Sequence, residues 1–313
     1  MTKVFTSNVL IESVKRRASI PVAQVTFQPA DFLAFADEEI SIGMLPSILK
    51  VHEDYLLYTD EVPLAASTSR YVIPHRSIGN KLREVAYLDN NDNIREMTRI
   101  NREDLPANSG SSNNLYTYYI ENNEVVIYPY ILGAVTGSLL FSYYLRPNQM
   151  VTEDRVSIIT SINRTTGEIF VNSIPSMFSV NSTYDFINSK SPFNTLKIST
   201  AVTGVNTITN VITVAIVNIP DRLSVGDYIN LQEETIVPQI PQDLHVVLAH
   251  RVAARCLEAI GDTEGLTNAN AKLSEMEMNT ANLIENRVEG SPRKIINRNS
   301  HLSAGWRRRG RMR

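Results

Sequence analysis

Residues 196–217 read LKISTAVTGVNTITNVITVAIV. Runs of Val, Ile and Thr interrupted by Gly and Asn are typical of β-strands joined by tight turns. The surrounding residues share this composition and are poor in Leu and Ala, and further short strands are predicted at 158–162, 168–171 and 184–187. We therefore predict a separate all-β domain inserted at residues 151–238, either a small barrel or a sandwich.

Residues 1–150 combine helical patterns with β-hairpins. A helix is predicted at 6–18, and Asp31 is the expected N-cap of a second helical stretch that kinks or breaks at Pro46. Apolar and polar residues then begin to alternate, and the clearest hairpin is predicted at 115–131. This part is interpreted as the first half of a helical core that also carries β-hairpins.

Helical patterns return at residues 239–290. Asp243 is the expected cap of a first helix, Gly261 its end, and a second helix follows over 266–288. Two helices joined by a short Gly-bounded turn form an αα-hairpin. The predicted fold class is therefore α+β: a helical core with a C-terminal αα-hairpin, β-hairpins, an inserted small β-barrel or sandwich, and an extended basic tail at 291–313.

The charge of the chain is divided unevenly along the sequence. The 313 residues include 30 Lys and Arg against 33 Asp and Glu, a formal net charge of −3. Eight of the basic residues and none of the acids lie in residues 293–313, which leaves 22 bases against 33 acids, a net charge of −11, in residues 1–292. The chain is therefore an acidic body with a basic tail, and this asymmetry is informative about partners.

The composition also limits the classes of protein to which the chain can belong. With 43% hydrophobic and 20% charged residues, the body can build a sizeable core, which excludes a wholly disordered chain. The sequence shows no signal-peptide pattern and no apolar run long enough to span a membrane. We therefore expect synthesis and assembly in a reducing cytoplasm, with no membrane partner.

The sequence contains no motif that predicts an enzyme. Phosphate-binding, nucleophile-elbow and HExxH patterns are all missing, so no catalytic, cofactor-binding or metal-ligating residues are assigned and no cofactor is expected. Cys256 is expected to be a buried thiol, and His245 and His250 a partly exposed pair near a helix start. Residues 37–39 (Asp-Glu-Glu) are interpreted as a solvated face. Residues 89–93 (DNNDN) are interpreted as a polar hairpin turn, because the EF-hand pattern fails downstream.

The tail carries the strongest functional signal. Arginine forms forked hydrogen bonds to carboxylates or phosphates and stacks on aromatic rings. Three interpretations stay open: a solubilising tail, phosphate contacts to nucleic acid, and docking into an acidic protein surface. The candidate partner-binding residues are Arg293, Lys294, Arg298, Trp306, Arg307, Arg308, Arg309, Arg311 and Arg313.

Several short motifs along most of the chain, from about residue 30 to 300, resemble a known group of proteins. They are Pro63-Leu64, YVIP (71–74), RSIGNKLREV (76–85), IREMTRI (94–100), LSVGDYI (223–229), PQIP (238–241), AARCLEAIGDTEGL (253–266) and ENRVEGS (285–291). Together they resemble the head-to-tail adaptors of tailed bacteriophages, of the short-tailed or crAss-like type, which are also called connector, neck or ring proteins.

The resemblance implies a structural protein of the virion, located at the head–tail junction and assembled in the bacterial host cytoplasm. It implies a closed homododecameric ring below the portal, with the helical parts as the adaptor core. The expected partners are other copies of the chain, the portal protein, downstream tail or tail-hub proteins, and genomic DNA that passes through the channel without specific binding. The C-terminal tail is expected to reach into the portal assembly.

Two other functions remain as alternatives. The first is a nucleic-acid-binding protein that uses the basic tail on phosphates. The second is an enzyme such as a virion glycanase in the β domain, which needs two suitably separated carboxylates and for which Glu168 and Asp185 are the candidates.

Overall fold

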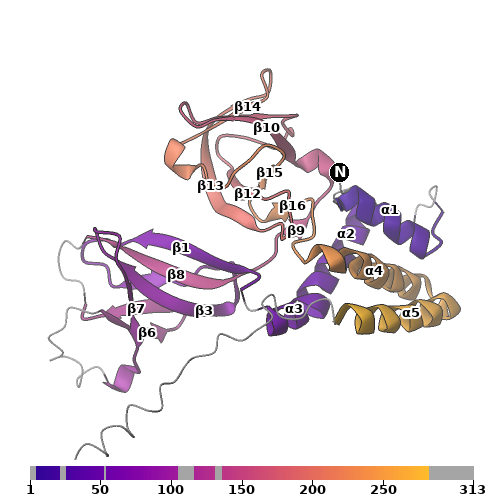
Figure 1. Cartoon of the computed structure of the whole chain (residues 1–313), viewed down its shortest axis with the longest axis horizontal. Coiled ribbons are helices and arrows are strands. Elements are labelled where there is room, and N and C mark those ends of the chain that lie inside the picture. The colour runs from indigo at the N-terminus through magenta and orange to yellow at the C-terminus, as the bar shows by residue number, and fades with distance from the viewer. Residues whose placement is uncertain (1–4, 22–25, 53, 105–115, 131–135, 282–313) are drawn as a thin grey trace, which may run out of the picture.

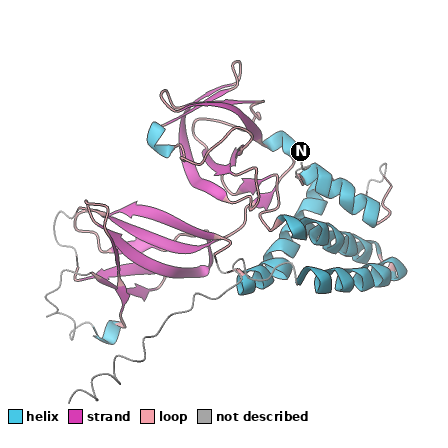
Figure 2. Cartoon of the chain, in the orientation of Figure 1, coloured by secondary structure: helices cyan, strands magenta, loops and turns pink. Residues whose placement is uncertain are grey.

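The computed structural model describes residues 5–21, 26–52, 54–104, 116–130 and 136–281 (Figure 1). The predicted α+β class is confirmed at this level, because the described chain combines several helices with a small six-stranded barrel and further sheets. The helices gather at one end, and the strands form two separate groups (Figure 2).

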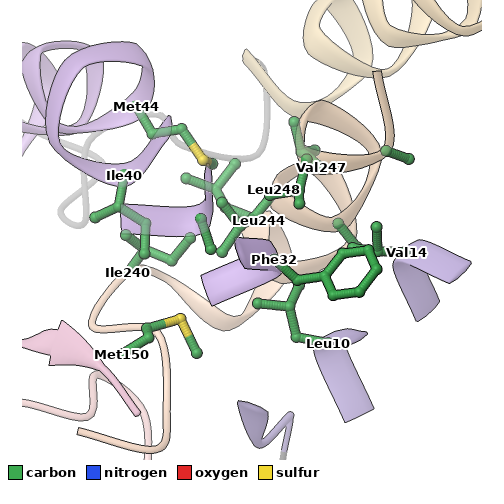
Figure 3. Packing of buried hydrophobic residues seen from close by; sticks show 14 of the residues in the cluster. Leu10, Val14, Phe32, Ile40, Met44, Met150, Ile240, Leu244, Val247 and Leu248 are labelled. Atoms are coloured by element: carbon green, nitrogen blue, oxygen red, sulfur yellow. The ribbon is translucent and has the colours of Figure 1, made fainter. Parts of the chain in front are cut away.

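The helical unit is assembled from both ends of the chain. Helix α4 packs against α1 and α2, so the N-terminal and C-terminal segments share one core. Leu10, Val14, Phe32 and Leu248 are completely buried in it (Figure 3). Burial of each large apolar side chain contributes roughly 1.5–3 kcal/mol. The elements are α1 (Ser7–Arg17), α2 (Pro29–Glu38), the π-helix η1 (Glu39–Met44), α3 (Leu45–Val51), the 3-10 turn η6 (Gln242–Leu244), α4 (His245–Ile260) and α5 (Thr263–Ala281).

Two predicted helix starts were wrong. Helix α2 begins at Pro29 with Gln28 as N-cap, and the Asp31 carboxylate accepts a hydrogen bond from the Gln28 N–H at 2.7 Å as part of a capping box. Asp243 lies inside η6 and does not cap α4. In both cases an acidic residue near the helix start was mistaken for the cap.

The predicted interruption near Pro46 takes a different form. The helix continues through the π-turn η1 into α3, and Pro46 lies in the first turn of α3, directly after the π-turn. The predicted end of α4 is confirmed, because Gly261 adopts a left-handed φ of 83° and its N–H reaches the Leu257 carbonyl at 3.0 Å. Residues 282–290 of the predicted αα-hairpin and the tail lie outside the described residues.

The hairpins of the first half pack as two sheets around a common core. The sheet orders are β1-β8-β3-β4 and β2-β7-β6-β5, and the core includes Val125, Ile127, Phe141 and Tyr143. The predicted turn at residues 89–93 connects β3 to β4, and the predicted hairpin at 115–131 is β6 and β7. The strands are β1 (Leu57–Pro63), β2 (Arg70–Val72), β3 (Ser77–Leu88), β4 (Ile94–Glu96), β5 (Thr98–Arg99), β6 (Thr117–Glu121), β7 (Glu124–Tyr128) and β8 (Ser138–Leu145), with a 3-10 turn η2 at Arg102–Asp104.

The inserted β segment forms a closed barrel in the order β10-β11-β14-β13-β12-β15. The choice between a barrel and a sandwich is thereby decided in favour of the barrel. Its interior is filled by buried side chains such as Ile169, Tyr184, Phe186 and Ile212. The strands are β10 (Ser157–Asn163), β11 (Glu168–Val171), β12 (Thr183–Ile187), β13 (Thr195–Asn206), β14 (Val211–Val214) and β15 (Tyr228–Leu231), with 3-10 turns η4 (Glu153–Arg155) and η5 (Ile216–Asn218).

Two short parallel strands join the entry and exit of the barrel. They are β9 (Gln149–Met150) and β16 (Glu234–Thr235). An apolar cluster that includes Phe193 and Val237 lies beside them, and the Phe193 ring stands 5.3 Å from that of His245 at the start of α4. The barrel is thus packed against the helical unit at the point where the chain passes between them.

Candidate interaction site

All nine sequence-predicted binding residues, Arg293 to Arg313, lie outside the described residues. The structure describes the body of the chain that precedes them in the sequence. The segment that contains them follows α5, which ends the described chain at Ala281.

The sheets, the barrel and the linker between them meet at a buried polar network, which we call the junction network. Its centre is an ion pair between Arg76, just before β3, and Asp185, in β12. Arg76 Nη2 lies 2.9 Å from Asp185 Oδ2, and Arg76 Nη1 lies 3.1 Å from Oδ1. The two side chains are 3% and 0% exposed, so the pair is shielded from water.

Three further groups donate hydrogen bonds to the Asp185 carboxylate. The Ser199 N–H donates to Oδ1 at 2.8 Å, while the Glu233 N–H and the Asn148 amide donate to Oδ2 at 3.0 and 2.9 Å. The Gln239 side chain accepts from the Asn148 N–H at 2.7 Å and extends the network toward α4. A buried charge is tolerated when it is paired and hydrogen-bonded in this way.

The two carboxylates proposed for glycanase chemistry are held apart by the barrel. Asp185 is fully buried in the junction network, whereas Glu168 lies on β11 and accepts a hydrogen bond from the Thr166 hydroxyl at 2.8 Å. Strands β11 and β12 are not neighbours in the barrel. The structure therefore does not bring these two residues together.

We predict that Arg76→Leu lowers the free energy of unfolding by about 3–5 kcal/mol, because it leaves Asp185 buried without its counter-charge. The matched control is Arg70→Leu, which removes ion pairs to Glu121 and Glu124 from a side chain that is 50% exposed, and should change stability very little. Urea denaturation of both variants provides the measurement. Equal effects would contradict the role given to the junction network.

A cleft of about 220 Å³ opens beside the junction network, with Asp37, Arg76, Arg146 and Glu233 in its wall. Asp37 Oδ1 accepts from the Met150 N–H at 2.9 Å, and Oδ2 is buried with no hydrogen-bond partner among the described residues. Burial raises the pKa of Asp37 to about 7, and the Met150 hydrogen bond opposes this shift. The interpretation of this acid as part of a solvated face was therefore wrong.

Asp37 should make stability depend on pH. Its pKa is raised from 3.8, so the folded chain retains a proton that the unfolded chain has lost between about pH 4 and 7. The free energy of unfolding therefore falls as pH rises through this window, by at most about 4 kcal/mol. His245, whose pKa is lowered to about 4 by burial, acts in the opposite direction below pH 6.5.

Comparison of the wild-type protein with Asp37→Asn separates the pH effect of Asp37 from that of His245, because the variant retains His245. We predict that Asp37→Asn is the more stable protein at pH 8 and that its advantage disappears near pH 4. Thermal unfolding at both pH values is the measurement. A constant difference between the two proteins would show that Asp37 titrates normally.

Glu39 is also buried, so the solvated-face interpretation is correct only for Glu38, which is exposed. Only 8% of Glu39 is exposed, and its carboxylate is held by two arginines of α4. Arg255 Nε lies 2.7 Å and Arg251 Nη1 3.0 Å from its oxygens, and Arg251 also pairs with Glu277 of α5. We call this group the Glu39 clamp, and it fastens the π-turn to the αα-hairpin.

The clamp depends on Gly43, where the π-turn brings its backbone under the ion pair. A Cβ at Gly43 would lie 2.4 Å from Arg251 Nη1 and 2.7 Å from Glu39 Oε2. We predict that Gly43→Ala destabilises the protein by about 1–3 kcal/mol, although alanine is the better helix former. Ser47→Ala, at an exposed position of α3, is the control and should be close to neutral in thermal unfolding. A stabilised Gly43→Ala variant would contradict the clamp.

The remaining candidate residues are accounted for by packing. Cys256 is fully buried as predicted, and burial raises its pKa to about 12. His245, expected to be partly exposed, is 1% exposed between the rings of Phe5 and Phe193. His250 Nε2 lies 3.1 Å from the Ala269 carbonyl oxygen.

The described chain contains neither a metal-binding cluster nor a membrane-spanning helix. Within it, no three His, Cys, Asp or Glu side chains lie close enough together to hold a metal ion. Nor does the described part contain a helix whose length and apolar character would allow it to cross a membrane.

Sequence reasoning missed the junction network and the Glu39 clamp. One available signal was Asp185, the charged residue in the middle of the apolar strand TYDFI (183–187). A carboxylate at such a position is buried only when it has a partner of opposite charge or hydrogen-bond donors. No protein-family model matches the sequence, and no curated protein matches it.

Proposed function

We propose that this chain is a structural, non-enzymatic protein of a bacteriophage virion. Copies of it form a homododecameric ring that joins the portal to the tail and lines the DNA channel. The observation that carries the proposal is the charge division: a net charge of −11 over residues 1–292 and eight basic residues without an acid over residues 293–313. The resemblance of motifs spread along the chain to head-to-tail adaptors supports the same role.

The construction of the body suits a connector. A ring subunit between two larger assemblies must keep its parts in register when force acts across it. The Arg76–Asp185 pair, the Asp37–Met150 hydrogen bond and the Glu39 clamp each join separate parts of the fold. Because the first of these is shielded from water, relative movement of the sheets and the barrel would separate the two charges and leave each of them buried without its partner, which is costly.

Each charge region has its own role in this proposal. The acidic body would repel the DNA phosphates, so genomic DNA could slide through the channel without specific binding. The basic tail would bind an acidic socket on the portal through forked arginine–carboxylate hydrogen bonds, with Trp306 as an apolar anchor.

Replacement of the five C-terminal arginines tests this proposal. We predict that changing Arg307, Arg308, Arg309, Arg311 and Arg313 to Gln weakens binding to the portal protein of the same phage roughly 30-fold or more, since several charge-assisted contacts are lost together. The same five changes to Lys are the matched control; they preserve the charge but lose the fork, and should show intermediate affinity. Biolayer interferometry measures the affinities, and unchanged binding by the Gln variant would exclude the tail as the portal contact.

The same proteins test the nucleic-acid alternative, which the basic tail also favours. In that case the full chain would bind duplex DNA at low salt, its affinity would fall steeply with salt, and the slope would decrease as arginines are removed. Gel shifts across a salt series measure this. DNA binding of this kind without portal binding would replace the proposed function with the alternative.

A further inference from the structure

The cleft of about 220 Å³ beside the junction network, which we call the Asp37 cleft, lies where parts of the fold meet. The helical unit contributes residues 37, 40 and 41 to its wall, the segment that leads into β9 contributes 146–149, and the barrel exit contributes Glu233. Figure 1 shows β9 and β16 between the barrel and the helical unit. Small ligands often bind at such meeting points. Because sites for drug-sized molecules measure roughly 300–1,000 Å³, this cleft suits a smaller molecule or a single side chain.

Several groups in the wall have hydrogen bonds left to donate. Arg146 is exposed, and its guanidinium has no hydrogen bond or ion pair with any described residue. The side chains of Ser41 and Gln149 are also exposed and have no hydrogen bond within the described part of the chain. Arg76 is buried, and its side-chain bonds in the junction network all come from Nη1 and Nη2, so its Nε–H has no partner among the described residues.

The acids of the wall differ in how much they oppose an anion. The Oδ2 atom of Asp37 is buried without a described partner, and burial raises the pKa of this carboxyl group to about 7. At and below neutral pH it is therefore largely uncharged and able to donate a hydrogen bond itself. Glu233 lies 3.0 Å from the His75 ring nitrogen, and its side chain is 51% exposed, so water weakens its repulsion. Donors therefore dominate the free hydrogen-bonding groups of the cleft.

We propose that the Asp37 cleft is a binding site for a carboxylate, which lies in the fork of the Arg146 guanidinium and accepts a hydrogen bond from Asp37. A carboxylate has the planar shape that the arginine fork matches and can accept several hydrogen bonds at once. A doubly charged phosphate fits less well, because Glu233 in the same wall repels the second charge. The carboxylate can belong to a free small acid or to an acidic side chain of a second copy. This inference does not depend on the proposed ring.

Asp37 gives the site a pH dependence. Its neutral form donates to the carboxylate and its ionised form repels it, so affinity should fall as pH rises from 6 to 8. The other charged or titratable groups at the cleft are Arg76, Arg146, and Glu233 with its neighbour His75. An Asp37→Asn variant retains all of these and removes only the titration of Asp37.

Isothermal titration calorimetry of the full chain with glutarate tests the site, with glutaramide, the uncharged diamide, as the ligand control. Glutarate should bind and glutaramide should not. Arg146→Gln should weaken glutarate binding about 10-fold or more, because a forked, charge-assisted contact is lost. Arg222→Gln, at an exposed position before β15, is the matched control and should bind like the wild type. Both arginines are exposed, so neither variant should impair folding. Absence of glutarate binding, or equal losses in the two variants, would overturn the site.

The same titration at pH 6 and pH 8 tests the part played by Asp37. The wild type should bind glutarate more tightly at pH 6, whereas Asp37→Asn should bind with similar affinity at both pH values, because asparagine donates a hydrogen bond without titrating. A variant that keeps the full pH dependence of the wild type would exclude Asp37 from the site.

Assembly measurements identify the source of the carboxylate. If a second copy supplies it, saturating glutarate should dissociate the assembled protein, and Arg146→Gln should assemble less tightly than Arg222→Gln. If a free acid supplies it, glutarate should raise the melting temperature and leave assembly unchanged. A chain that assembles into rings but binds no glutarate would overturn the carboxylate site alone.

Discussion

The ion pair between Arg76 and Asp185 is the constraint on which the body of this protein depends. Both charges are taken out of water at the place where the sheets, the barrel and the connecting strands meet. Each must then find its partners within the protein, because an unpaired buried charge costs several kcal/mol. The short strands β9 and β16 lie next to this pair, and the donors from Asn148 and Glu233 come from the segments that hold those strands.

The order of the elements along the chain explains why buried contacts between the parts of the fold are needed. The helical unit is begun by α1 to α3 and completed by α4 and α5, with the sheets and the barrel inserted between them. Each inserted part has its own apolar core, so its internal packing does not determine where it sits against the others. The junction network, the apolar cluster around Phe193 and the hydrogen bond from Met150 to Asp37 supply that placement.

Features encoded by neighbouring residues were predictable from the sequence. The left-handed Gly261 after an amphipathic helix, the turn at 89–93 and the strand-rich composition of 151–238 each act locally, and each was found in the structure. The predictions that Asp37, Glu39 and His245 would be exposed or partly exposed were wrong for a different reason. Their burial is imposed by partners far away in the chain; Arg251, for example, is 212 residues from Glu39. A local pattern cannot indicate that an acidic residue faces such a partner.

We propose that this chain assembles into a closed ring that is attached to a portal by its basic tail. Native mass spectrometry of the full-length protein, with and without the portal protein of the same phage, tests it most directly. We expect the mixture to contain one complex with a single fixed number of copies of this chain per portal, twelve for a homododecamer. A chain that remains monomeric beside an unoccupied portal, or that binds it with a continuous range of copy numbers, would contradict the proposed ring.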